Sequence, residues 1–132
     1  MALDIRGLVP LLQVFDMPTS IHFYRDSLGF EVVNTSRPGE HFGWALLRFN
    51  GVELMLNTAY ESDERPPVPD PNRVLGHGDT GLYFGCPDVE GAYKQLRVKG
   101  LDVKEPVIRT YGMNQLNIID PDGYNLCFQW PA

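Results

Sequence analysis

The chain has 132 residues, of which 43% are hydrophobic, and a formal net charge of -6. This length is sufficient for one globular domain over residues 1–132. The acidic balance argues against nucleic acid as a partner, because nucleic-acid-binding proteins carry a basic face. No apolar run reaches the roughly 18 residues of a membrane helix. The N-terminus lacks a signal peptide's apolar segment, and the 2 cysteines are too few for a disulfide framework. We therefore expect a cytoplasmic protein that binds neither nucleic acid nor membranes.

The first elements are a strand and a helix. Residues 8–14 read as a strand with Pro10 near its start, where a missing amide donor is tolerated. Asp16 is a suitable N-cap, and Pro18 suits the first turn of the helix that follows. Gly29 should end this helix, since glycine readily adopts the left-handed conformation wanted there.

Three strands follow the first helix. They are predicted over residues 30–36, 42–49 and 52–57. Asn50-Gly51 separates the last two, and this pair is one of the strongest short-range signals for a hairpin.

A proline-rich segment then spans residues 59–79. It contains Pro66, Pro67, Pro69 and Pro71, so we predict neither a helix nor an interior strand there. We interpret it as the connection between two modules, and a connection of this length is either functional or a flexible linker.

The second half repeats the pattern of the first. We predict a strand over 80–86, a helix over 88–99, and strands over 101–108, 114–119 and 124–130, the last two joined by a tight turn at 120–123. Val14-Phe15-Asp16 before the first helix corresponds to Cys86-Pro87-Asp88 before the second. The order βαβββ therefore occurs twice, in a first module (5–58) and a second module (80–130). This predicts an α+β fold with a groove between pseudo-symmetric halves.

Two motifs extend this interpretation to a family. Leu28-Gly29-Phe30 after the first helix and the turn Asp120-Pro121-Asp122-Gly123 before Tyr124 resemble the vicinal-oxygen-chelate superfamily, which includes glyoxalase I, bleomycin resistance proteins and extradiol dioxygenases. The resemblance covers roughly residues 5–130. It implies two βαβββ modules that form a curled mixed sheet around a cavity, usually in a homodimer. We assign the turn at 120–123 a structural role only.

The resemblance also implies where a metal would bind. In register with the family, the four ligand positions are Val9, Glu53 (or Met55, one pleat on), Gly81 and Cys127. Valine and glycine side chains offer no donor, and a divalent ion normally needs three or more protein ligands. We therefore expect no metal and no cofactor. A metal site built from His41, His77 and Glu53 is an alternative that would require the fold to bring these three residues together.

Without a metal, the expected chemistry of the cavity is recognition. Strand alternation selects the side chains that should face it. Aromatic rings and thioethers among them suit a flat, aromatic or cationic ligand held by a few hydrogen bonds. Arg48 either pairs with Glu53 across the hairpin or binds an anionic group of the ligand. The predicted ligand-binding residues are Gln13, Trp44, Arg48, Glu53, Met55, Asn57, Tyr83, Tyr111, Met113 and Cys127.

Three functions fit these observations. The one we favour is a metal-independent, homodimeric small-molecule-binding protein that sequesters an antibiotic or metabolite. An alternative is a divalent-metal-dependent lyase or dioxygenase that resembles glyoxalase I. A third is a catalytically silent domain that binds another protein through a sheet edge. The sequence does not identify the ligand, a reaction or the dimer arrangement.

Overall fold

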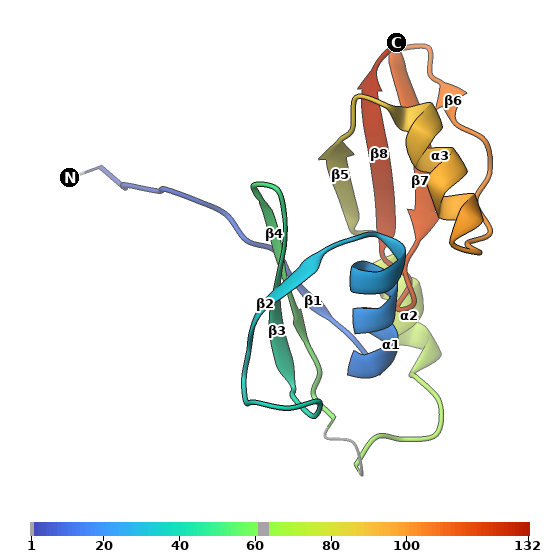
Figure 1. Cartoon of the computed structure of the whole chain (residues 1–132). Helices are drawn as coiled ribbons and strands as arrows, with labels where there is room; N and C mark the ends of the chain where they lie inside the picture. The colour runs from blue at the N-terminus through green and yellow to red at the C-terminus, as the bar shows by residue number, and fades with distance from the viewer. Residues whose placement is uncertain (1, 61–63) are drawn as a thin grey trace.

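A computed structural model describes residues 2–60 and 64–132. The elements follow the order βαβββ twice, with a short helix between the two copies (Figure 1). In the first copy they are β1 (Leu11–Gln13), α1 (Met17–Ile21), η1 (His22–Ser27), β2 (Glu31–Thr35), β3 (Trp44–Phe49) and β4 (Val52–Asn57). The connecting helix is α2 (Pro71–His77). The second copy comprises β5 (Gly81–Gly85), α3 (Val89–Val98), β6 (Val107–Ile108), β7 (Met113–Ile119) and β8 (Asn125–Pro131).

Each module forms its own four-stranded mixed sheet, in the order β1-β4-β3-β2 and β5-β8-β7-β6. The edge strands β1 and β5 run parallel to β4 and β8, and the other pairs are antiparallel. The predicted α+β class and the repeated βαβββ order are confirmed. The two sheets are not closed around a cavity within one chain.

Backbone hydrogen bonds fix which residues of the two modules are equivalent. Val14 N donates to Asn57 O at 2.8 Å, and Cys86 N donates to Gln129 O at 2.9 Å. Asn57 therefore corresponds to Gln129. Counting back two residues along β4 and β8, Met55 corresponds to Cys127.

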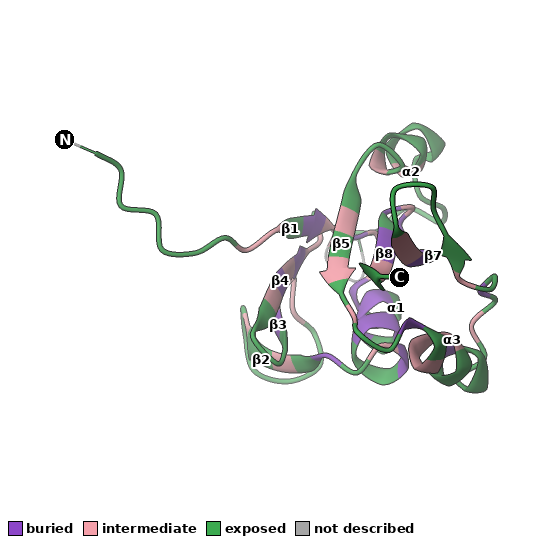
Figure 2. Cartoon of the chain, turned by 90° about the horizontal axis from the view of Figure 1, so that it is seen from above, coloured by how far each residue is buried: buried purple, intermediate pink, exposed green. Residues whose placement is uncertain are grey.

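The two principal helices differ in burial. α1 and its continuation η1 bury side chains along most of their length, including Ser20, Phe23 and Tyr24, whereas α3 buries only Val89 and Leu96 (Figure 2). η1 is a π-helical turn, and Gly29 ends it at a φ of 97°, as predicted.

The β7–β8 turn joins the second module to the first. Tyr24 Oη donates to Asp120 Oδ2 at 2.6 Å. Asp122 accepts from Phe15 N at 2.7 Å and from Ser20 Oγ at 3.2 Å. Burial raises the pKa of both Asp120 and Asp122. The turn is structural, as predicted, and its carboxylates hold the two modules together.

The proline-rich connection contains the short helix α2, so the prediction that it holds no helix is wrong. Asp70 caps this helix by accepting from Asn72 N at 2.9 Å, and Pro71 stands in the first turn, where no amide donor is needed. Residues 61–63 of the predicted connection lie outside the described residues.

Two predicted strands are shorter than expected. β1 begins at Leu11 rather than residue 8, and β6 contains only Val107–Ile108 of the predicted 101–108. The predicted hairpin at Asn50-Gly51 is confirmed, because Phe49 pairs with Val52 and Asn50 adopts a φ of 53°. Within the described part of the chain, no helix has the length and apolarity needed to cross a bilayer.

Candidate functional site

Strand alternation gives each sheet two different faces. One face packs against helices and contributes buried residues such as Leu12, Leu56 and Leu126. We call the other side the open face. On the first sheet it carries the predicted residues Gln13, Trp44, Arg48, Glu53, Met55 and Asn57, and on the second sheet Tyr83, Met113 and Cys127.

The first open face has three cross-strand rows. Gln13 and Trp44 flank Asn57, whose Nδ2 donates to Gln13 Oε1 at 3.2 Å. Met55 forms an apolar row with Leu11 and Leu46. The third row is ionic.

This ionic row is the pair of Arg48 and Glu53. Arg48 Nη2 donates to Glu53 Oε2 at 2.8 Å, which confirms the first of the two interpretations of Arg48. The same row also carries Glu31 of β2, opposite Arg48, so it holds one arginine and two carboxylates.

The second open face has a hydrogen-bond network centred on Gln115. Its Oε1 accepts from Arg109 Nε and from Tyr111 Oη, each at 3.1 Å. Its Nε2 donates to Gln129 Oε1 at 2.8 Å. Tyr111 thereby joins the predicted face from the loop before β7. The rigid row of Gln115 and Gln129 lies in the position of Trp44 and Asn57 in the first module.

Sequence reasoning missed part of this network. The alternation that selects Cys127 also selects Gln129, and Gln115 lies opposite it on β7. That signal was present in the sequence. Arg109 belongs to an irregular segment after β6, so strand alternation cannot place its side chain.

Cys127 lies between Tyr83 and Asn117 on neighbouring strands. It is buried, and burial raises the pKa of its thiol. The thiol therefore stays protonated near neutral pH, which disfavours both nucleophilic and metal-binding roles for the sulfur.

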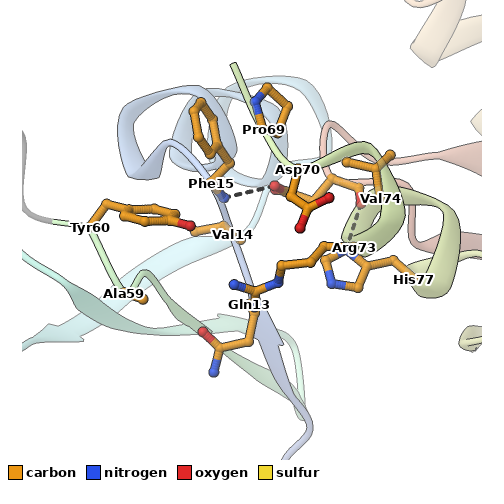
Figure 3. A pocket seen from close by; sticks show the side chains of 11 residues that line it. Gln13, Val14, Phe15, Ala59, Tyr60, Pro69, Asp70, Arg73, Val74 and His77 are labelled. Atoms are coloured by element: carbon orange, nitrogen blue, oxygen red, sulfur yellow. Dashed lines mark hydrogen bonds between the residues drawn. The ribbon is translucent and has the colours of Figure 1, made fainter. Parts of the chain in front are cut away.

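The structure gathers each set of predicted residues on its own sheet. Among the described residues, no hydrogen bond joins one open face to the other. Gln13 also lines a cavity of about 30 Å³ near Tyr60, Arg73 and His77 (Figure 3). A cavity of this size holds one or two water molecules, so it is no ligand site by itself.

His77 is committed to contacts with the β7–β8 turn. Its ring stacks on Tyr124 with centroids 4.1 Å apart, and its Nδ1 lies 2.7 Å from Asp122 O. Within the described residues, no three His, Cys, Asp or Glu side chains gather in a metal-binding cluster. The structure therefore does not bring His41, His77 and Glu53 together.

A comparison with protein families identifies the family of this chain. The family model for the glyoxalase/bleomycin resistance protein/dioxygenase superfamily matches residues 8–128. The chain belongs to this superfamily. No curated protein matches the chain significantly.

Several solved structures share the fold of this chain. The virulence protein STM3117 from Salmonella typhimurium is 24% identical, with a TM-score of 0.70 over 100% of both chains. A bleomycin-binding protein complexed with bleomycin is 20% identical, with a TM-score of 0.70 over 97% of this chain and 100% of that one. TnmS3, an antibiotic-binding protein from Streptomyces sp. CB03234, is 23% identical, with a TM-score of 0.66 over 98% and 100%.

The residues at the superfamily's metal positions do not fit a divalent ion. The equivalence of Met55 with Cys127 places the β4 position at Met55, while neighbouring Glu53 is paired with Arg48. The full set becomes Val9, Met55, Gly81 and Cys127. A thioether and a protonated thiol are poor ligands for a hard divalent ion, and the other two residues have no donor. We derive no chemistry through a metal in this superfamily member.

Proposed function

We propose that this protein is a homodimeric, metal-independent small-molecule-binding protein that sequesters an antibiotic or metabolite. The observation that carries the proposal is the open face of the second sheet. Tyr83, Tyr111 and Ile119 are 67%, 66% and 67% exposed there, around the ordered network of Gln115 and Gln129. Large apolar surfaces of this kind mark binding sites.

A second copy of the chain is the proposed cover for this face. Each sheet supplies one wall with aromatic or amide side chains, and neither wall is enclosed within one chain. Residues 2–9 add support, because they extend away from the body of the protein with Leu3, Ile5 and Leu8 exposed (Figures 1 and 2). In the proposed dimer, the first sheet of one copy faces the second sheet of the other.

The proposed ligand is aromatic and carries hydrogen-bonding groups. Tyr83 and Trp44 offer rings for stacking, and Arg109, Tyr111 and Gln115 form a pre-ordered polar patch. The acidic net charge of -6 is compatible with a cationic group elsewhere on the ligand. We further propose a reducing compartment such as the cytoplasm, since Cys86 and Cys127 are both unpaired.

Titration with bleomycin tests this proposal, because a similar structure holds that drug. The readout is tryptophan fluorescence, with Trp44 on the first open face. We expect quenching at micromolar concentrations and about tenfold weaker binding for Tyr83→Ala, whose lost stacking is worth roughly 1.4 kcal/mol. Tyr93→Ala, on the outer helix α3, is the matched control and should bind like the wild type.

Three results would contradict parts of the proposal. The absence of quenching at tens of micromolar removes bleomycin-type ligands. A monomer by sedimentation at micromolar concentration removes the second copy as the cover. Elemental analysis of protein purified without chelator completes the test, since stoichiometric metal that is lost in a Glu53→Ala variant would favour the enzyme alternative.

A further inference from the structure

A second cavity lies between the modules, on the side of the sheets away from the open faces. We call it the inter-module cavity. Its volume is about 220 Å³, and its walls include Phe30, Phe49, Phe84, Phe128 and Leu96. Phe84 and Phe128 have the opposite strand parity to Tyr83 and Cys127. The cavity is therefore separate from the proposed ligand site.

The aromatic side chains around this cavity are held in a fixed arrangement. The rings of Phe84 and Phe128 stack with centroids 5.1 Å apart and an interplanar angle of 17°. Phe30 meets Phe49 edge-on at 5.6 Å and Phe84 edge-on at 6.3 Å. Rings arranged in this way offer both faces and edges to another ring.

The cavity lining is uncharged and its mouth is apolar. Among the described residues that line it, none has an ionised side chain, and the polar members are neutral groups such as Asn50 and Gln95. Phe49 and Val52, from the ends of the β3–β4 hairpin, are 42% and 46% exposed at this position. An ionic ligand would lose its hydration there without gaining a partner.

A small residue on α3 keeps the cavity open. Ala92 lines it from the second module, at the position that corresponds to Ser20 of α1 when Asp16 is aligned with Asp88. Ser20 is buried against the β7–β8 turn, whereas Ala92 leaves space between α3 and the β3–β4 hairpin. A larger side chain at residue 92 would fill this space.

We propose that the inter-module cavity is a binding site for a neutral aromatic molecule of one or two fused rings. An apolar cavity of about 150 Å³ is enough to bind benzene, so 220 Å³ accommodates a bicyclic ring. The volume is too small for a folded segment of another chain. Occupancy would bridge the two modules, since the walls come from η1, β3 and β4 of the first module and from β5, α3 and β8 of the second.

Indole is the probe for this site, and Cys86 is the reporter. Cys86 is a half-buried free thiol that lines the cavity. Burial raises its pKa, so alkylation by iodoacetamide is followed at about pH 8.5 by peptide mass spectrometry. With a dissociation constant of about 1 mM, roughly 5 mM indole should slow alkylation about sixfold. The buried Cys127 is followed in the same spectra as a monitor of global unfolding.

Matched variants of α3 locate the effect. Ala92→Leu fills the cavity and should abolish protection by indole, whereas Val98→Leu, an exposed position on the same helix, should retain it. Val52→Glu places a charge at the exposed mouth without disturbing the core. It should weaken indole binding about tenfold, which lowers protection at about 5 mM indole from about sixfold to about 1.5-fold. Protection is measured within each variant as the ratio of the rates without and with indole. Indole-3-acetate, which carries a charge, should protect less than indole.

Three outcomes would overturn the proposal. The first is unchanged Cys86 alkylation at 5 mM indole in the wild type. The second is protection that persists in both Ala92→Leu and Val52→Glu. The third is a Cys86 rate that falls with protein concentration in the absence of indole, because a second copy would then cover the cavity.

Discussion

The two equivalent hairpin turns of this protein have opposite surroundings. The β3–β4 turn, Asn50-Gly51, is exposed at the mouth of the inter-module cavity. The β7–β8 turn is buried against the first module, and its Asp120 and Asp122 are only 4% and 5% exposed. The repeat therefore conserves the path of the chain while the two copies of the turn differ in role.

This difference explains why the first helix is central and the second peripheral. Partners for the β7–β8 turn come from α1 and η1, through Ser20 Oγ and Tyr24 Oη, and from the backbone amide of Phe15. The exposed turn has no comparable set of contacts with α3 among the described residues. The β7–β8 turn thus joins the modules, whereas the β3–β4 turn leaves a cavity between them.

The largest expected effect comes from Asp120→Ala. Its carboxylate accepts from Tyr24 Oη, Asp122 N and Tyr124 N, and removal leaves three buried donors without an acceptor. Each unsatisfied donor costs about 1–3 kcal/mol, and removal of the buried charge offsets part of this cost. We therefore expect the free energy of unfolding, measured with urea, to fall by about 3–5 kcal/mol. Asn50→Ala in the exposed turn is the control. It should lower the free energy of unfolding by about 1 kcal/mol, because alanine adopts the left-handed backbone conformation less readily than asparagine. Equal losses would refute the comparison.

Tyr24→Phe removes one of these contacts and should have a smaller effect. The ring stays in the core, while Asp120 loses a 2.6 Å hydrogen bond. We expect a loss of about 1–2 kcal/mol in the free energy of unfolding. Tyr93→Phe on α3 is the matched control, because its hydroxyl accepts from an exposed Arg97 at 2.9 Å, and it should cost less than about 0.5 kcal/mol. In a double-mutant cycle, Tyr24→Phe should cost less once Asp120 is already alanine.

Local signals in the sequence were sufficient for most elements of this fold and for the two faces of each sheet. Asn50-Gly51 predicted the hairpin, Gly29 predicted the end of the first helix, and alternation separated Leu126 from Cys127. Contacts distant in sequence were not accessible in this way. Tyr24 and Asp120 are 96 residues apart, and nothing near either residue indicates the other.

Two further features were hidden for different physical reasons. The four prolines of the connection argued against any helix there, so α2 was not predicted. Pro71 is nevertheless compatible with the first helical turn, since Asp70 provides the cap. The separation of the two open faces could not be predicted because it depends on how the modules dock. Strand alternation fixes only which way a side chain points from its own sheet.

A pH titration of Asp122→Asn sharpens the comparison through the sign of its effect. Burial, and then the charge of Asp120, raise the pKa of Asp122, while His77 lowers it. The folded protein therefore holds the proton to higher pH than the unfolded chain. The stability from this group is full below the ordinary carboxyl pKa and is lost as pH rises through the raised value. Asparagine has no such loss and can still accept from Phe15 N.

We therefore expect the stability of Asp122→Asn relative to the wild type to increase as pH rises from about 4 to 7. Thermal unfolding across this range measures it. Asp26→Asn provides a control of opposite sign, because the hydrogen bond from Arg25 lowers the pKa of Asp26. Its relative stability should fall as pH rises through the range below about 4, where the unfolded chain loses this proton, and should stay nearly level from about 4 to 7. Parallel pH profiles for the two variants would contradict the assignment of Asp122 to a buried, desolvated site.

The smallest expected effect concerns the open face of the first sheet, where polar groups are exposed to solvent. Glu53→Gln removes the ion pair with Arg48, whose side chain is 46% exposed. Pairs of this kind contribute about 0.2–1 kcal/mol and are screened by salt, so the loss should be about 0.5 kcal/mol in low salt and close to zero in about 1 M NaCl. Urea unfolding at both salt concentrations measures it. A loss above about 2 kcal/mol that resists salt would contradict this expectation, because it would show that the Arg48–Glu53 pair is desolvated.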